Sequence, residues 1–394
     1  MLPRSIRPRL EALARRFPVV TVTGPRQSGK TTLCRATFPR KRYVSLEAVD
    51  AREHARDDPR GFLDGLRDGA ILDEVQRAPD LLSYLQGEVD ERPAPGRFVL
   101  TGSANLLLLQ SISQSLAGRS AFLQLLPLGL DEIRHAKTPP GDLWTVIWRG
   151  GYPVLFDREL DPPDWLDAYV TAYVERDVRQ ILNVGDLISF QTFLRLAASR
   201  SAQLVALSAL GADAGVTHNT AKAWLSVLET SFLVFRLPAF HANLGKRLVK
   251  TPKLHFVDTG LLCFLLGIRE PAQLAAHPLR GPIFETWVVS EILKSRLNAG
   301  LPPSLAFFRD RKGLEIDAIV EGAGTLLAVE AKSGRTIAAD FTRSLESFEA
   351  QMEGVRPLRR IRSFLVHGGL DEGRRRGVTL LPWNAVDQGP WVKP

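Results

Sequence analysis

The sequence VVTVTGPRQSGKTTL, at residues 19–33, constrains the fold of this chain more than any other feature. An apolar run comes first, then a turn that spaces Gly24 from Gly29 by four residues, and then a stretch with helical character. In strand–loop–helix order this spacing is the P-loop pattern, whose glycines let backbone N–H groups and a helix N-terminus approach a phosphate. The loop residues are Gly24, Pro25, Arg26, Gln27, Ser28, Gly29, Lys30, Thr31 and Thr32. They predict a nucleotide-binding α/β domain with a parallel sheet.

Two acids end the apolar run of GAILDEVQ, downstream of the loop. We expect Lys30 to reach the β- and γ-phosphates of ATP, Thr31 and Asp73 to hold Mg²⁺, and Glu74 to orient the attacking water. A further apolar run, RFVLTGS, ends at Ser103, which is placed either to sense the γ-phosphate or merely to begin a turn. Together these motifs predict an ATPase that requires ATP and Mg²⁺.

Four segments, TGPRQSGKTTL, ILDEVQ, LTGSANLLL and LAGRSAFLQLLPLGLDEI, carry a family resemblance. The chain resembles the AAA-type (AAA+) P-loop ATPases of bacteria and archaea that have a C-terminal domain of unknown function. RGGYP and LHFVDTGL also fit, so the resemblance covers nearly the whole chain. It implies a sheet of the additional-strand, catalytic-glutamate class. It also makes Arg119, in LAGR, a candidate γ-phosphate arginine, in its own site or a neighbouring subunit's; the alternative is an ordinary surface arginine.

The middle of the chain reads as three helices followed by a basic ribbon of two strands, which is the order of a winged helix. Thr217 would cap the third helix. The residues near its exposed start are His218, Asn219, Thr220 and Lys222. Those expected on the wing are Lys246, Arg247, Lys250 and Lys253. Two functions fit this pattern, namely contact with DNA phosphates or packing against another domain.

The sequence LEIDAIVEGAGTLLAVEAKSG predicts two strands joined by a glycine-containing turn near the C-terminus. Asp317 lies on the first strand, whereas Glu330 and Lys332 share one face of the second. An upstream amphipathic helix adds Glu285. This order resembles the PD-(D/E)XK nucleases, in which the three carboxylates would hold a metal and the lysine would activate a water. The alternatives are a solvated hairpin, or a scaffold that binds nucleic acid or protein without cleavage.

Bulk composition sets the remaining expectations. With 394 residues and 45% hydrophobic content we expect several folded domains, at 1–145 (ATPase), 146–272 (winged-helix-like) and 273–394 (nuclease-like). A net charge of +8 favours an anionic partner, for which nucleic acid such as DNA, nucleotide and acidic protein are the alternatives. The two cysteines are far apart, and the apolar runs are short, so we expect a cytoplasmic protein with no membrane partner. A homo-oligomer remains an open alternative.

Overall fold

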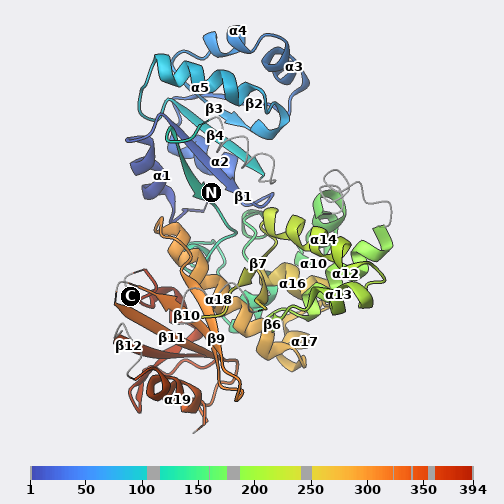
Figure 1. Cartoon of the computed structure of the whole chain (residues 1–394), viewed down its shortest axis with the longest axis vertical. Helices are drawn as coiled ribbons and strands as arrows, with labels where there is room; N and C mark the ends of the chain where they lie inside the picture. Colours follow the sequence, from blue (N-terminus) through green and yellow to red (C-terminus); the bar gives the residue numbers. More distant parts are fainter. Residues whose placement is uncertain are drawn as a thin grey trace.

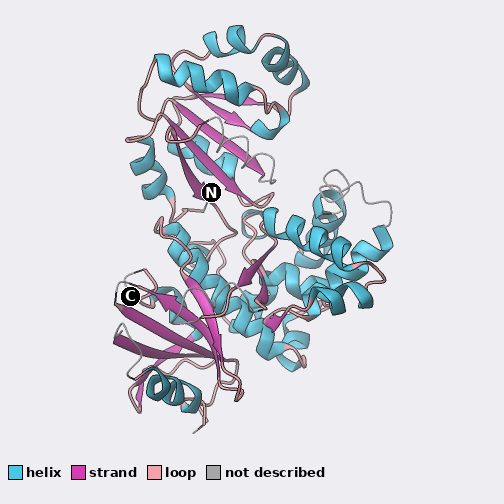
Figure 2. Cartoon of the chain, in the orientation of Figure 1, coloured by secondary structure: helices cyan, strands magenta, loops and turns pink. Residues whose placement is uncertain are grey.

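A computed structural model describes residues 2–103, 116–158, 160–174, 187–240, 251–322, 324–338, 340–353 and 360–392 of the chain. Three parts follow one another along the chain. The N-terminal sheet lies at the top of Figure 1, the helical middle at the right, and the C-terminal sheet at the lower left. Helices dominate the middle part, strands dominate the last, and in the first part helices surround a sheet (Figure 2).

The N-terminal part is a parallel sheet of the P-loop ATPase type. Its strands run in the order β2-β3-β4-β1-β5, and every neighbouring pair is parallel. The strand β4 therefore lies between β1, which leads into the P-loop, and β3, which carries Asp73. The elements are α1 (Arg7–Ala14), β1 (Val19–Gly24), α2 (Lys30–Thr37), β2 (Arg42–Ser45), α3 (Val49–Asp57), α4 (Pro59–Asp64), β3 (Ala70–Asp73), η1 (Val75–Arg77), α5 (Leu81–Glu91), β4 (Phe98–Ser103), β5 (Ser120–Gln124) and α7 (Leu130–Ile133).

Helices cover both faces of this sheet, as the buried apolar runs of its strands require. Alternate residues of each strand point to opposite faces, so Leu72 packs with α3, α4 and α5, whereas Ile71 packs with α1 and α2. Figure 1 shows α5 above the sheet and α1 at its left. This layering fixes the carboxyl ends of β1, β3 and β4 at one edge of the sheet.

The middle part is mainly helical and contains one small antiparallel sheet in the order β6-β8-β7. Its helices pack through aromatic side chains, with Trp224 edge-on to Phe190 and Phe193. The elements are α8 (Leu143–Arg149), α9 (Val154–Asp157), α10 (Pro162–Tyr169), η2 (Val170–Val174), α12 (Leu187–Ser199), β6 (Gln203–Leu204), α13 (Leu207–Asp213), α14 (His218–Thr230), β7 (Val234–Leu237), β8 (Lys253–Phe256), α16 (Thr259–Leu265) and α17 (Pro271–Ala276).

The C-terminal part is a six-stranded mixed sheet in the order β13-β14-β12-β11-β10-β9. The strands β9, β10 and β11 form an antiparallel meander, and β12 joins β11 in parallel. The helices α18 and α19 cover opposite faces. The elements are α18 (Arg280–Asn298), β9 (Leu305–Arg309), β10 (Glu315–Glu321), β11 (Thr325–Lys332), α19 (Arg343–Met352), β12 (Arg360–His367), β13 (Gly373–Arg375), β14 (Val378–Pro382) and η3 (Trp383–Gln388).

One hydrophobic core runs from the end of the N-terminal part through the middle part into the C-terminal sheet, from Leu126 to Trp391. The helix α18 lies at the junction of the three parts (Figure 1). Its buried Glu291 accepts a hydrogen bond from the backbone N–H of Leu130 at 2.7 Å and pairs with Lys294 at 2.8 Å. The middle and C-terminal parts thus share one hydrophobic core. Among the described residues, no helix has both the length and the apolar character needed to cross a membrane.

Candidate functional site

The P-loop lies between β1 and α2 in a conformation that only glycine allows at its two ends. Gly24 has φ 152°, and a Cβ there would lie 2.0 Å from the carbonyl oxygen of Leu125. Gly29, with φ 89°, directly precedes α2, and Gln27 also adopts a positive φ of 62°. Successive turns of this kind direct backbone N–H groups into a concave anion site. The side-chain oxygen of Ser28 is buried and has no hydrogen-bond partner among the described residues, which fits a loop built around a ligand.

Lys30 lies across the mouth of this loop. Its Nζ donates hydrogen bonds to the carbonyl oxygens of Gly24 at 3.0 Å and Pro25 at 2.8 Å. Burial lowers the pKa of Lys30 to about 8, partly offset by the charges of Glu74 and Asp73. A phosphate in the loop would restore the ammonium's counter-charge, so the position suits an anion.

Asp73 at the end of β3 is held by three hydroxyl groups. Thr31 Oγ1 lies 3.0 Å from both carboxylate oxygens, Tyr43 Oη donates to Oδ2 at 2.7 Å, and Thr101 Oγ1 donates to Oδ1. Carboxylate and hydroxyl oxygens are the ligands that Mg²⁺ prefers. The residue types and their convergence beside the P-loop therefore fit the magnesium ion that this fold implies.

Glu74 follows Asp73 in a left-handed backbone conformation, with φ 57°. A non-glycine residue in this region costs of order 1–3 kcal/mol and persists where the surroundings impose it, often at functional sites. The side-chain amide of Gln76 donates a hydrogen bond to Glu74 Oε2. The chain therefore turns away from the direction of β3 at Glu74, immediately after Asp73.

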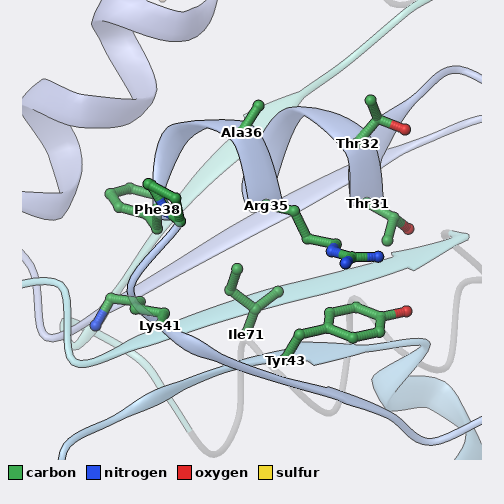
Figure 3. Close-up of a pocket in the computed structure, with 9 residues that line it drawn as sticks. Thr31, Thr32, Arg35, Ala36, Phe38, Lys41, Tyr43 and Ile71 are labelled. Carbon is green, nitrogen blue, oxygen red and sulfur yellow. The ribbon is translucent and has the colours of Figure 1, made fainter.

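Tyr43 is a site residue that the motifs did not reveal. It belongs to the short strand β2 and lines a cavity of about 500 Å³ with Thr31, Arg35 and Lys41 (Figure 3). The guanidinium of Arg35 lies 4.8 Å from the centre of the Tyr43 ring. Burial and the hydrogen bond to Asp73 raise the pKa of Tyr43 to about 12, so it remains a hydrogen-bond donor at neutral pH.

A second cavity, of about 260 Å³, opens beside Gly29 at the start of α2. Leu2, Pro3 and Pro8 of the N-terminal segment line it together with Pro153 of the RGGYP sequence. Arg4 joins this wall to the P-loop, because it donates to the carbonyl oxygen of Ser28 at 2.6 Å and to Glu132 at 3.0 Å. The basic N-terminal segment carried no recognised motif, so sequence reasoning passed over these residues.

Arg119 lies near the amino ends of the parallel strands, whereas the P-loop lies at their carboxyl ends. This corrects one of the two placements that the family resemblance allowed, namely the one in the chain's own nucleotide site. Arg119 directly precedes β5, whose first residue pairs with Val19 at the start of β1. Gly24 is five residues further on, or roughly 17 Å at about 3.3 Å per residue. Arg119 instead forms a bidentate pair with Asp90. Ser103 ends β4 opposite Gly24, and its side chain is outside the described part.

A second polar cluster lies in the C-terminal sheet, near the start of β10 and the end of β11 and beside α18. Glu330 Oε1 pairs with Lys332 at 2.6 Å, and Asp317 Oδ2 accepts the N–H of Ala331 at 2.8 Å. The register of β10 shifts between Ile316 and Ile319, a bulge that re-aims Asp317. Burial and the Asp317 charge raise the pKa of Glu330 to about 8, against the opposing effects of Lys332 and Lys253.

Glu285 on α18 is linked to this cluster by the ammonium group of Lys253. The ammonium of Lys253 contacts Glu285 at 2.7 Å, Glu315 at 2.5 Å and Asp317 at 3.8 Å. Glu330 Oε2 is buried without a hydrogen-bond partner in the described part of the chain, which fits a bound cation. Nevertheless, no three acidic, histidine or cysteine side chains of the described residues converge as metal ligands.

Lys253 is not on an exposed wing, and that prediction was wrong. It is the first residue of β8 and only 2% exposed, because the antiparallel pairing with β7 carries it into the junction with the C-terminal sheet. Lys246, Arg247 and Lys250 lie in 241–250, outside the described residues. Thr217 does cap α14, since its hydroxyl accepts the N–H of Thr220 at 3.2 Å.

Comparison with known proteins divides the chain into three matched regions. Residues 16–134 match the family described as "AAA domain", residues 140–272 a domain of unknown function (DUF8612), and residues 280–386 a domain of unknown function (DUF4143). Among solved structures, the Walker-type ATPase PABY2304 of Pyrococcus abyssi shares 14% identity with a TM-score of 0.43, over 66% of this chain and 94% of that one. That likeness is too low to inform the fold.

Two relatives match much of the chain. The uncharacterized proteins Rv2008c of Mycobacterium tuberculosis and Mb2031c of Mycobacterium bovis are each 35% identical over 348 residues, which cover 86% of this chain and 75% of the relative. The P-loop, Asp73 and Glu74 lie within the region that matches the AAA domain. The chain belongs to the family of these two mycobacterial proteins, and its N-terminal region is an AAA domain of the P-loop ATPase type.

Proposed function

We propose that this protein is a Mg²⁺-dependent ATPase whose nucleotide state controls a winged-helix segment and a nuclease-like C-terminal region that acts on DNA. The observation that carries the ATPase proposal is the convergence of Lys30, Thr31, Asp73 and Glu74 at one edge of the parallel sheet. Polar side chains at the carboxyl ends of parallel strands are where such folds bind ligands.

Each residue has a distinct role in this proposal. The P-loop N–H groups and Lys30 bind the β- and γ-phosphates, while Glu74 orients the water that attacks the γ-phosphate. Thr31 and Asp73 would hold Mg²⁺, which would neutralise charge on the phosphates. Arg119 can contact a γ-phosphate only in the site of a neighbouring subunit. A homo-oligomer would be needed for that role, and the proposal leaves it open.

The adenine base fits the smaller cavity beside Gly29. The cavity adjoins the start of α2, and its walls are mainly the apolar side chains of Leu2, Pro3, Pro8 and Leu128. Flat apolar surfaces of this kind suit a planar base, and Arg4 links them to the loop that takes the phosphates. The N-terminal segment would thus report on the bound nucleotide.

Two observations support a DNA-directed role. The order α12–β6–α13–α14–β7–β8, with a sheet in the order β6-β8-β7, supports the proposal of a winged helix. His218, Asn219 and Lys222 are exposed at the start of α14. The order α18–β9–β10–β11–α19–β12, with Asp317 on β10 and Glu330 and Lys332 on β11, supports the proposal of a PD-(D/E)XK nuclease-like region. Lys332 would orient the water that attacks a phosphodiester.

A scaffold that binds nucleic acid or protein without cutting is the second candidate. The contact of Lys253 with Glu285, Glu315 and Asp317 favours it, because an ammonium already neutralises part of the acidic cluster.

Cleavage of labelled linear, nicked and branched DNA by the wild type and by Lys332→Ala, with Mg²⁺ or Mn²⁺ and with or without ATP, separates the two. Metal-dependent cutting that Lys332→Ala loses would support the nuclease. Intact ATP hydrolysis without cutting on any substrate would support the scaffold.

A further inference from the structure

Lys253 is a lysine in an unusual place. It starts the central strand of the small sheet in the middle part, yet its side chain reaches into the C-terminal part and is 2% exposed. Its Nζ lies 5.6 Å from the centre of the Phe307 ring on β9. A lysine is almost never this buried unless its charge is matched.

Carboxylates of the C-terminal part neutralise the charge of Lys253. Glu285 on α18 and Glu315 on β10 lie within 2.7 Å and 2.5 Å of the ammonium, and Asp317 lies within 3.8 Å. These carboxylates raise the pKa of Lys253 above its usual value despite the opposing effect of burial. Two carboxylates within hydrogen-bond distance match the charge of its ammonium, so Lys253 is the cation that bridges α18 to β10.

The negative charge around Glu330, in the rest of the cluster, is only partly neutralised. Glu330 shares its Oε1 with Lys332, while its Oε2 is buried with no partner in the described part of the chain. Four carboxylates (Glu285, Glu315, Asp317 and Glu330) face three cations, namely the ammonium groups of Lys253 and Lys332 and the guanidinium of Arg309, which lies 3.4 Å from Glu315, so acids exceed bases by one. Such an excess in a buried site favours uptake of a further cation.

The geometry restricts where that cation can bind. Mg²⁺ requires oxygen ligands at about 2.0–2.1 Å in a compact shell. An ammonium that already hydrogen-bonds Glu285 and approaches Asp317 occupies the space between these two carboxylates, and its charge repels a divalent ion. Glu285 and Asp317 can ligate one metal together with Glu330 only after Lys253 has moved away.

We propose that Lys253 is an internal cation that holds the acidic site of the C-terminal region closed, and that a divalent cation binds Glu285, Asp317 and Glu330 in its place. This inference rests on the nuclease-like role proposed for that region. The strand β8 would then be the element through which the middle part controls the site, because displacement of β8 withdraws the ammonium.

The test is Mn²⁺ binding to the full chain without nucleotide, measured by calorimetry and by the electron paramagnetic resonance signal of free Mn²⁺. Lys253→Met keeps the apolar stem and removes the charge, and it should bind Mn²⁺ at least about tenfold more tightly than the wild type. Adding Asp317→Asn should abolish the gain. Lys294→Met is the matched control, since Lys294 is 5% exposed and paired with Glu291 outside the cluster.

The readouts separate two kinds of failure. Equal, Asp317-dependent Mn²⁺ affinity in the wild type and Lys253→Met would overturn the role of Lys253 and leave the metal site standing. Absence of any Asp317-dependent binding in both would overturn the metal site as well. Lys253→Gln, which can still hydrogen-bond the carboxylates, serves if Lys253→Met does not fold. In either variant, thermal stability should rise more with Mn²⁺ than in Lys294→Met.

Discussion

Replacing Tyr43 by phenylalanine removes one of the three hydroxyl groups that orient Asp73 and leaves the ring and its contact with Arg35 in place. A hydrogen bond to a charged group contributes about 1.5–3 kcal/mol, and loss of a group that orients a metal ligand weakens metal binding roughly 10–100-fold. Thr31 and Thr101 still form hydrogen bonds with the Asp73 carboxylate, so we expect the lower end of this range of weaker metal binding. We expect about tenfold weaker Mg²⁺ activation, equivalent to about 1.4 kcal/mol.

The assay is ATP hydrolysis as a function of Mg²⁺ concentration at fixed ATP. The Mg²⁺ concentration for half-maximal activity should rise about tenfold in Tyr43→Phe, with a smaller change in maximal rate. Tyr84→Phe is the control, because Tyr84 is 42% exposed on α5. An unchanged or lower half-maximal concentration would show that Tyr43 does not orient Asp73, or that its hydroxyl mainly competes with the metal.

Three further predictions concern other sites. Arg4→Gln should weaken ATP binding roughly tenfold in a fluorescent-nucleotide titration, because a buried charge-assisted hydrogen bond to the P-loop carbonyl of Ser28 is lost; unchanged affinity would contradict this. Arg119→Ala should leave turnover of the monomeric chain unchanged, and a loss that appears only as protein concentration rises would assign Arg119 to a neighbour's site. Burial lowers the pKa of His255 to about 3, so below pH 6.5 only the unfolded chain gains its proton. Stability should therefore fall by roughly 2 kcal/mol between pH 6.5 and 5 in urea titrations, and this loss should be absent in His255→Phe.

The sequence was sufficient to predict the parallel sheet and the P-loop, because both leave local patterns. Apolar runs ending in Gly24 and Asp73 mark strands whose carboxyl ends share an edge. The antiparallel pairing that sets Asp317 beside Glu330 also followed from the spacing of alternating residues.

Contacts between distant elements left no such pattern. Tyr43 lies on a short strand without a motif, and Arg4 meets Ser28 only through the folded N-terminal segment. The sequence around Lys253 is basic, which suggested an exposed wing, whereas the carboxylates that bury it come from α18 and β10. Arg119 was similarly ambiguous, because a motif does not tell at which edge of the sheet its residue lies.

The most direct test of the central claim is phosphate release from ATP by the wild type, Lys30→Ala and Glu74→Gln in Mg²⁺, with Lys222→Ala on the exposed start of α14 as the control. The account predicts turnover by the wild type and Lys222→Ala and none by the two site variants. It further predicts that folded Glu74→Gln still binds ATP. Hydrolysis by Lys30→Ala at the wild-type rate would contradict the assignment of the P-loop as the catalytic nucleotide site.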